Sequence, residues 1–85
     1  MREFTDAAGH RWRAAARDEP SADYKGRYFL VLEPVDGETS DMLELREVRW
    51  NSERTAARTI STMSGFELRR RLRSALGRNP ELRAS

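Results

Sequence analysis

The hydrophobic pattern of this chain changes its period near residue 50, and this change restricts the fold more than any other feature of the sequence. Over residues 12–16 the apolar side chains recur at every second position, which is the spacing of one face of a β-strand. Over residues 56–63 they recur at intervals of three and four, which is the spacing of one face of a helix. A block of strands followed by a block of helices predicts an α+β domain.

About four antiparallel strands in two hairpins are expected in the first part of the chain. The first hairpin joins residues 3–6 to residues 10–16 through a turn that contains Gly9. Residues 28–32 are apolar on both faces, as in a central strand, and residues 42–46 alternate, with Leu43 and Leu45 inward. The polar segment 17–26, which is broken by proline and glycine, is predicted to be a loop.

Two helices are expected after residue 50. Either Asn51 or Ser52 can cap the first helix by accepting a hydrogen bond from a free backbone N–H. Ser64 and Glu67 match a capping box that opens the second helix, and Gly77 is the predicted C-cap. The buried stripes are Ala56, Ile60 and Met63 on the first helix and Leu68, Leu72, Ala75 and Leu76 on the second.

The two C-terminal helices are expected to pack on one face of the sheet, in a single small domain over residues 1–78. Residues 79–85, which begin just before Pro80, are predicted to be a frayed tail. Phe66 lies off the buried stripe, and we expect it to pack against the preceding loop. Trp50 is expected to pack at the junction between the last strand and the first helix.

Length and composition restrict the environment and the function. A chain of 85 residues buries only roughly 60–65% of its unfolded surface, so a deep, enclosed active site is not expected. The absence of cysteine and of a signal-like segment favours a reducing cytoplasm. The longest apolar run, residues 28–32, is far shorter than the ~20 residues of a membrane span. The opening segment, residues 2–6 with Gly9 and Trp12, resembles hairpins that begin many small bacterial proteins, and this short resemblance implies nothing about function.

The residue inventory does not favour an enzyme, a metal site or a cofactor. The single histidine, His10, lies in a predicted turn with no obvious acid to orient it. Asp36, Glu38 and Asp41 cluster in one loop but lack the register of a calcium-binding hand. The five glycines are isolated, so no phosphate-binding glycine loop is present. We therefore expect a non-enzymatic binding module.

Charge is distributed unequally along the chain. Residues 1–47 contain seven basic and eleven acidic residues, a net charge of −4, whereas residues 48–85 contain nine arginines and three glutamates, a net charge of +6. Such an asymmetry indicates an anionic partner. A genome rich in G and C would also give this preference for arginine over lysine, and a helical arginine run is often only a solvated face.

Five arginines of the two helices are the predicted anion-binding or partner-binding residues: Arg54, Arg58, Arg69, Arg70 and Arg73. The favoured interpretation is a protein-binding subunit or adaptor whose basic two-helix face meets an acidic protein. The alternative is a nucleic-acid-binding protein that contacts the phosphate backbone. Arg54 and Arg58 are four residues apart, a like-charge spacing that is easier to understand if an anion lies between them.

The outer sheet face is a second predicted contact surface. If the inward leucines face the helices, then Phe29 and Val31 lie outside, ringed by charged residues such as Arg11 and Arg13. Apolar residues in that position indicate contact with a second copy of the chain, and hence a homo-oligomer, or with another protein. Alternatively, the loop 17–26 with Tyr24 folds over them.

Overall fold

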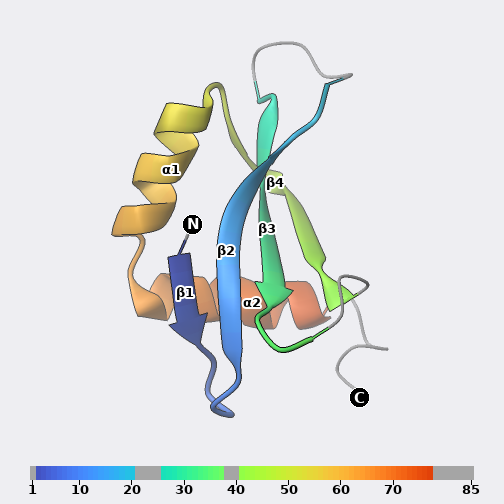
Figure 1. The fold of residues 1–85 in the computed structure, drawn as a ribbon, viewed down its shortest axis with the longest axis vertical. Coiled ribbons are helices and arrows are strands. Elements are labelled where there is room, and N and C mark those ends of the chain that lie inside the picture. Colours follow the sequence, from blue (N-terminus) through green and yellow to red (C-terminus); the bar gives the residue numbers. More distant parts are fainter. Residues whose placement is uncertain (1, 21–25, 38–40, 78–85) are drawn as a thin grey trace.

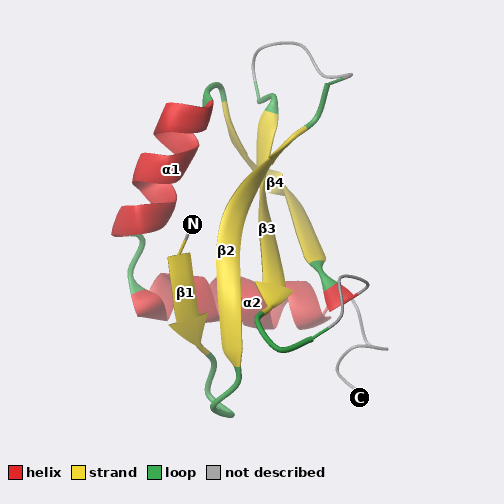
Figure 2. Cartoon of the chain, in the orientation of Figure 1, coloured by secondary structure: helices red, strands yellow, loops and turns green. Residues whose placement is uncertain are grey.

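The chain folds into one four-stranded sheet with both helices on one of its faces. The structure is a computed structural model that describes residues 2–20, 26–37 and 41–77. The strands β1 (Arg2–Thr5), β2 (Arg11–Asp18), β3 (Tyr28–Pro34) and β4 (Leu43–Trp50) form an antiparallel sheet in the order β1-β2-β3-β4. The helices α1 (Glu53–Thr62) and α2 (Gly65–Gly77) follow (Figures 1 and 2). The predicted α+β architecture is confirmed.

One core fills the space between the sheet and the helices. In the register of the sheet, Ala14 lies opposite Leu32, and Leu32 opposite Leu43, so the alternating apolar positions of neighbouring strands meet on one face. Trp50 is also buried there, as predicted for the strand-to-helix junction. From the helices, the core receives Ala56, Ile60, Leu68, Leu72 and Ala75, with Met63 and Leu76 partly buried against it.

Three strands extend beyond their predicted ends, of which β3 runs to Pro34 instead of residue 32. β2 continues through Arg17 and Asp18, which pair with Phe29 and Tyr28, so the predicted loop 17–26 was wrong at its start. β4 continues to Trp50 through a shift in register: Leu30 lies opposite Leu45, but Phe29 lies opposite Arg49. This bulge breaks the alternation of apolar and polar residues after residue 46, so the sequence pattern predicted too early an end for this strand. Tyr24, expected in that loop, lies outside the described residues.

Side-chain caps set the start of each helix. The hydroxyl of Ser52 accepts from the N–H of Thr55 at 3.2 Å, so Ser52 is the cap of α1. Asn51, the other candidate, accepts instead from the N–H of Gly26 at 3.0 Å and ties the end of the β2–β3 connection to the start of α1. Gly26 has a φ of +75°, a conformation that favours glycine.

Half of the predicted capping box is present in α2. The hydroxyl of Ser64 accepts from the N–H of Glu67 at 3.0 Å, while the carboxylate of Glu67 turns to Arg70 and Arg71. Gly77 is the last residue of α2, but it is not among the described glycines with positive φ. The predicted C-cap geometry was therefore wrong, and Pro80 with the predicted tail 79–85 lies outside the described residues.

Arg2 caps the opposite end of α1, which the sequence did not predict. Its Nη1 donates to the carbonyls of Ser61 and Met63, at 3.1 and 2.7 Å. α1 has no basic residue in its own last turn. The cation from β1 therefore supplies both the hydrogen bonds and the positive charge that a helix C-terminus favours.

No helix within residues 2–20, 26–37 and 41–77 is long and apolar enough to cross a membrane.

Candidate interaction surface

Apart from Arg2, which caps α1, the arginines of the sheet half are neutralised by the protein's own carboxylates. On the outer sheet face, Arg13 Nη1 lies 3.2 Å from Glu33 Oε1 and Arg17 Nη1 lies 3.7 Å from Glu44 Oε2. The first pair joins the neighbouring strands β2 and β3, and the second reaches from β2 across β3 to β4. The other paired arginines of this half are Arg11 with Asp36, Arg27 with Asp18, and Arg46 and Arg49 with Glu19.

Four arginines of the helices have no such partner. Arg54 and Arg58 of α1 and Arg69 and Arg73 of α2 are exposed, and none forms an ion pair or a side-chain hydrogen bond with any other residue that the structure describes. We call these four the free arginines. They form two pairs spaced four residues apart, so that each pair places like charges on neighbouring helical turns.

Arg70, the fifth predicted site residue, differs from the free arginines. Its Nη2 donates to both carboxylate oxygens of Glu67, at 3.0 and 2.8 Å. Arg71 shares that carboxylate at 3.1 Å. The charge that α2 leaves available is therefore carried mainly by Arg69 and Arg73. α1 runs along the long axis of the molecule and α2 crosses it near one end (Figure 1), so the α1 and α2 pairs project from differently oriented helices.

The only large apolar side chain that is exposed among the described residues is Phe66, at 67%. It was expected to pack against the preceding loop, and that expectation was wrong. Phe66 lies in the first turn of α2, away from the buried Leu68 and Leu72, because a helical step of about 100° per residue carries it off their stripe. This places an exposed aromatic ring beside the free arginines of α2.

The outer sheet face presents little apolar surface. Phe29 is only 1% exposed and Val31 only 5%. The guanidinium of Arg46 lies 4.6 Å from the centre of the Phe29 ring and that of Arg49 lies 5.6 Å away, a geometry in which cations are attracted to the ring face. Glu19 binds both guanidiniums.

The four residues of the predicted sheet-face contact differ in their exposure. Phe29 and Val31 are covered by side chains of the same chain, while Arg11 is exposed and Arg13 is about half-buried by its ion pair. The hydrogen bond from Arg49 lowers the pKa of Glu19, against an opposing effect of desolvation, which favours the charged carboxylate that binds Arg46 and Arg49. Oligomerisation through this face remains a prediction, which no contact in the structure tests.

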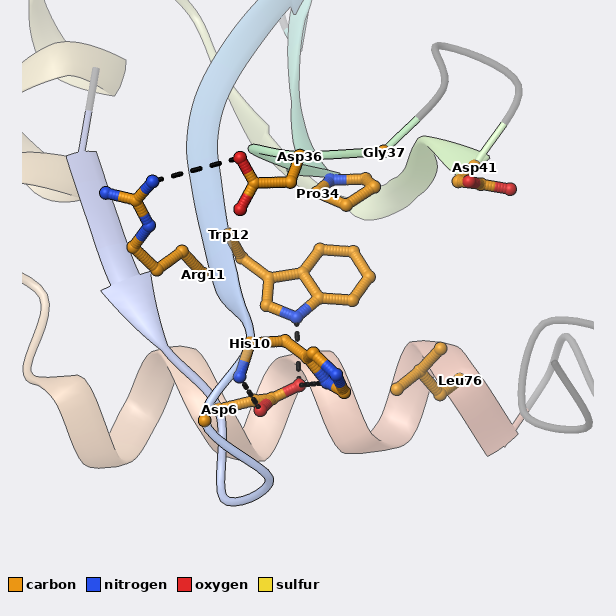
Figure 3. A pocket seen from close by; sticks show the side chains of 10 residues that line it. Asp6, His10, Arg11, Trp12, Pro34, Asp36, Gly37, Asp41 and Leu76 are labelled. Atoms are coloured by element: carbon orange, nitrogen blue, oxygen red, sulfur yellow. Dashed lines mark hydrogen bonds and ion pairs between the residues drawn. The ribbon is translucent and has the colours of Figure 1, made fainter.

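A cavity of about 750 Å³ adjoins the β1–β2 turn and includes His10, Asp36 and Asp41 in its lining (Figure 3). The carboxylate of Asp6 also lines it and accepts hydrogen bonds from the indole of Trp12 at 3.0 Å and from the N–H of His10 at 2.9 Å. Burial raises the pKa of Asp6, but hydrogen bonds from Trp12, His10 and Ala8 outweigh it and leave the pKa below its ordinary value of 3.8.

His10 has an acidic neighbour, contrary to expectation. Its Nδ1 lies 3.6 Å from Asp6 Oδ2, because the turn folds Asp6 back over the residue four positions later. The imidazole is nevertheless 78% exposed, and the described lining of the cavity includes no serine, threonine or cysteine that it could activate. This arrangement stabilises the turn, with Gly9 at a φ of +90°.

Within the described part of the chain, no group of three or more histidine and acidic side chains could hold a metal ion. Glu38, part of the predicted acidic loop cluster, lies outside the described residues. No protein-family model matches the sequence, and neither a curated protein nor a solved structure is significantly similar to it. The candidate surface is thus defined by its own geometry: the free arginines and the exposed ring of Phe66.

Proposed function

We propose that this protein is a non-catalytic interaction module of the cytoplasm, which binds an acidic protein partner through the free arginines of its helices. One observation carries the proposal: two like-charged arginine pairs have no partner among the described residues, whereas every arginine of the sheet half except the helix cap Arg2 is paired with a carboxylate.

The loss of stability that the arginine pairs and the exposed ring of Phe66 cause argues against a helical surface that contacts only water. Each like-charge pair four residues apart destabilises an isolated helix by about 0.2–0.5 kcal/mol, and exposed Phe66 contributes no burial to the core. A bias in genome composition would raise the arginine content of both halves of the chain. It does not explain why arginines of the sheet half are paired with carboxylates while the free arginines of the helices are not. A partner's carboxylates would relieve the repulsion within each pair.

Nucleic-acid binding is the second candidate, and the proximity of an exposed aromatic ring to free arginines favours it. The ring could stack on a base while the guanidiniums contact phosphates. Four free arginines predict a slope of log affinity against log salt of about −3 to −4. We rank this function second because Phe66 also borders a groove with a mostly apolar lining, a feature more typical of a protein interface than of a surface that contacts the phosphate backbone.

The experiment is affinity purification of a tagged chain from its native host, with and without nuclease. Three double variants remove the same charge: Arg69→Gln with Arg73→Gln, Arg54→Gln with Arg58→Gln, and, as the matched control, Arg17→Gln with Arg27→Gln on the sheet half. The control separates a local surface from the effect of net charge, because Arg17 and Arg27 are also exposed but already paired with carboxylates.

The proposal predicts a stoichiometric protein that survives nuclease treatment, is retained by the control variant and is lost with the α2 variant. Binding should weaken by more than about tenfold, since hydrogen bonds between charged groups contribute about 1.5–3 kcal/mol each. Equal loss in all three variants would indicate general attraction to a basic protein and contradict the proposal. Loss of the captured material on nuclease treatment would favour the nucleic-acid function.

A further inference from the structure

A groove of about 500 Å³ runs between α2 and the β1–β2 turn. Its lining is mostly apolar: Leu72 and Leu76 from α2, Ala7 and Ala8 from the turn, and the ring of Phe66 at one end. Leu72 belongs to the core and Leu76 is partly buried against it, so this side of the groove is fixed by the packing of α2. Phe66, at 67% exposure, is the lining residue with the most apolar surface to bury.

Two of the free arginines, Arg69 and Arg73, line the same groove. The one carboxylate in the lining, that of Asp6, does not neutralise them. Asp6 Oδ1 accepts from the N–H groups of Ala8 and His10, each at 2.9 Å, and Oδ2 accepts from the indole of Trp12. The groove therefore combines an apolar lining with two cations that remain available to an incoming anion.

From this combination we infer that the groove takes an acidic segment of the partner protein that carries one bulky apolar side chain. The apolar side chain lies against Phe66, Leu72 and Leu76, and the flanking carboxylates pair with Arg69 and Arg73. The inference rests on the proposed function and adds the chemistry of the partner's binding segment. Both contributions are needed, because exposed ion pairs alone are weak.

Asp6 and Leu76 also line the cavity at the other side of the β1–β2 turn (Figure 3). The two hollows consequently adjoin one another along the end of the molecule. A segment that is anchored beside Phe66 can extend past Leu76 towards His10 and Arg11. This continuity fits an extended protein segment better than a single small molecule.

The test selects peptides from a random library displayed on phage against the full-length chain. Selected peptides are then measured by fluorescence anisotropy against the unsubstituted protein and against Phe66→Ala, Phe66→Leu and the double variant Arg69→Gln with Arg73→Gln. Phe66→Leu is the matched control, since it keeps an apolar side chain on the groove. Circular dichroism checks that each variant is folded, which is expected because these positions are exposed.

The inference predicts enriched peptides in which acidic residues flank a bulky apolar one. Phe66→Ala should weaken them at least about tenfold, by loss of buried apolar area, Phe66→Leu should restore most of the affinity, and the arginine variant should weaken binding in a salt-dependent manner. Acidic peptides that bind equally well to Phe66→Ala would overturn the inference and leave the proposed function standing.

Three other outcomes would also overturn the inference. If the selection enriches no peptide, the groove does not bind protein segments, while the capture experiment still tests the proposed function separately. If a labelled RNA or DNA oligonucleotide binds in a manner that Phe66→Ala abolishes, the groove serves nucleic acid. If sedimentation shows a concentration-dependent dimer that Phe66→Ala abolishes, a second copy of the chain occupies it.

Discussion

Replacement of Arg54 by glutamate should stabilise the protein, although it removes a residue of the proposed binding surface. Arg54 is exposed in the first turn of α1, and it lies one helical turn before Arg58. The first turn is where a helix favours negative charge. Arg54→Glu therefore replaces an unfavourable cation with a favourable anion and converts a repulsive pair into an attractive one.

The expected gain can be estimated from three contributions. Removal of the like-charge pair returns about 0.2–0.5 kcal/mol, and the new pair with the carboxylate on the N-terminal side adds about the same. The interaction with the helix dipole adds about 0.3–1 kcal/mol. Arginine and glutamate have similar helix propensities, so the free energy of unfolding should rise by about 1 kcal/mol in total. For a domain of 85 residues, this corresponds to an increase in Tm of about 4–8 °C.

Calorimetry and urea denaturation at low salt measure this gain, and Arg17→Glu is the matched control. It makes the same change of charge, but Arg17 is paired with Glu44 at 3.7 Å. The control should therefore lose up to about 1 kcal/mol. Both effects should shrink at about 1 M salt, where screening extends over only about 3 Å.

The essential result is that Arg54→Glu raises the free energy of unfolding whereas Arg17→Glu lowers it. If Arg54→Glu lowers the stability, then the free arginines of α1 carry no electrostatic strain and one premise of the proposed function fails. If both variants stabilise the protein equally, the gain comes from the lower net charge of the whole molecule, and the distinction between paired and free arginines has no energetic meaning.

Three further predictions concern the fold. Arg2→Met should lower the free energy of unfolding by about 1–2 kcal/mol, because it leaves the C-terminal carbonyls of α1 without a cationic donor; unchanged urea midpoints would rule out the cap. Phe29→Ala should cost about 3–5 kcal/mol in urea denaturation, and a loss below about 1 kcal/mol would show that the arginine cover does not depend on the ring. Asp6→Asn should be less stable than the unsubstituted protein at pH 7. Because the pKa of Asp6 is lower in the folded state than its ordinary value of 3.8, its stabilisation is present above about pH 4 and is lost as the pH falls through the folded-state pKa. The difference between the two proteins should therefore shrink in acid, and a constant difference would contradict this role.

The fold was largely predictable because the hydrophobic period reports which face of each element is buried. Leu43 and Leu45 on one strand, and Leu68 and Leu72 on one helix, each have only one face on which to meet the core. The bulge near Leu30 was not predictable, because it depends on which residues of β4 find partners. The cap that Arg2 forms on α1 depends on tertiary contact between opposite ends of the chain, and no local pattern indicates such a contact.

The site was predictable only in part. The sequence identified the exposed arginines, because their helical positions lie away from the apolar stripe. The arginines were grouped by their shared exposure, although the spacing of three residues between Glu67 and Arg70 indicates that Glu67 neutralises Arg70 and leaves Arg69 and Arg73 free. The groove arises where α2 passes the β1–β2 turn, and only the packing of distant segments creates it. The position of Phe66 off the buried stripe was the one sequence feature that pointed to an exposed ring beside the groove.

The most direct test of the central claim is the affinity of the purified partner protein, measured by calorimetry at equal ionic strength. The α2 double variant Arg69→Gln with Arg73→Gln is compared with the sheet double variant Arg17→Gln with Arg27→Gln, which has the same net charge. We predict a loss of more than about tenfold for the α2 variant and less than about twofold for the sheet variant. Equal losses, or a larger loss for the sheet variant, would contradict the proposal that the free arginines of the helices bind the partner.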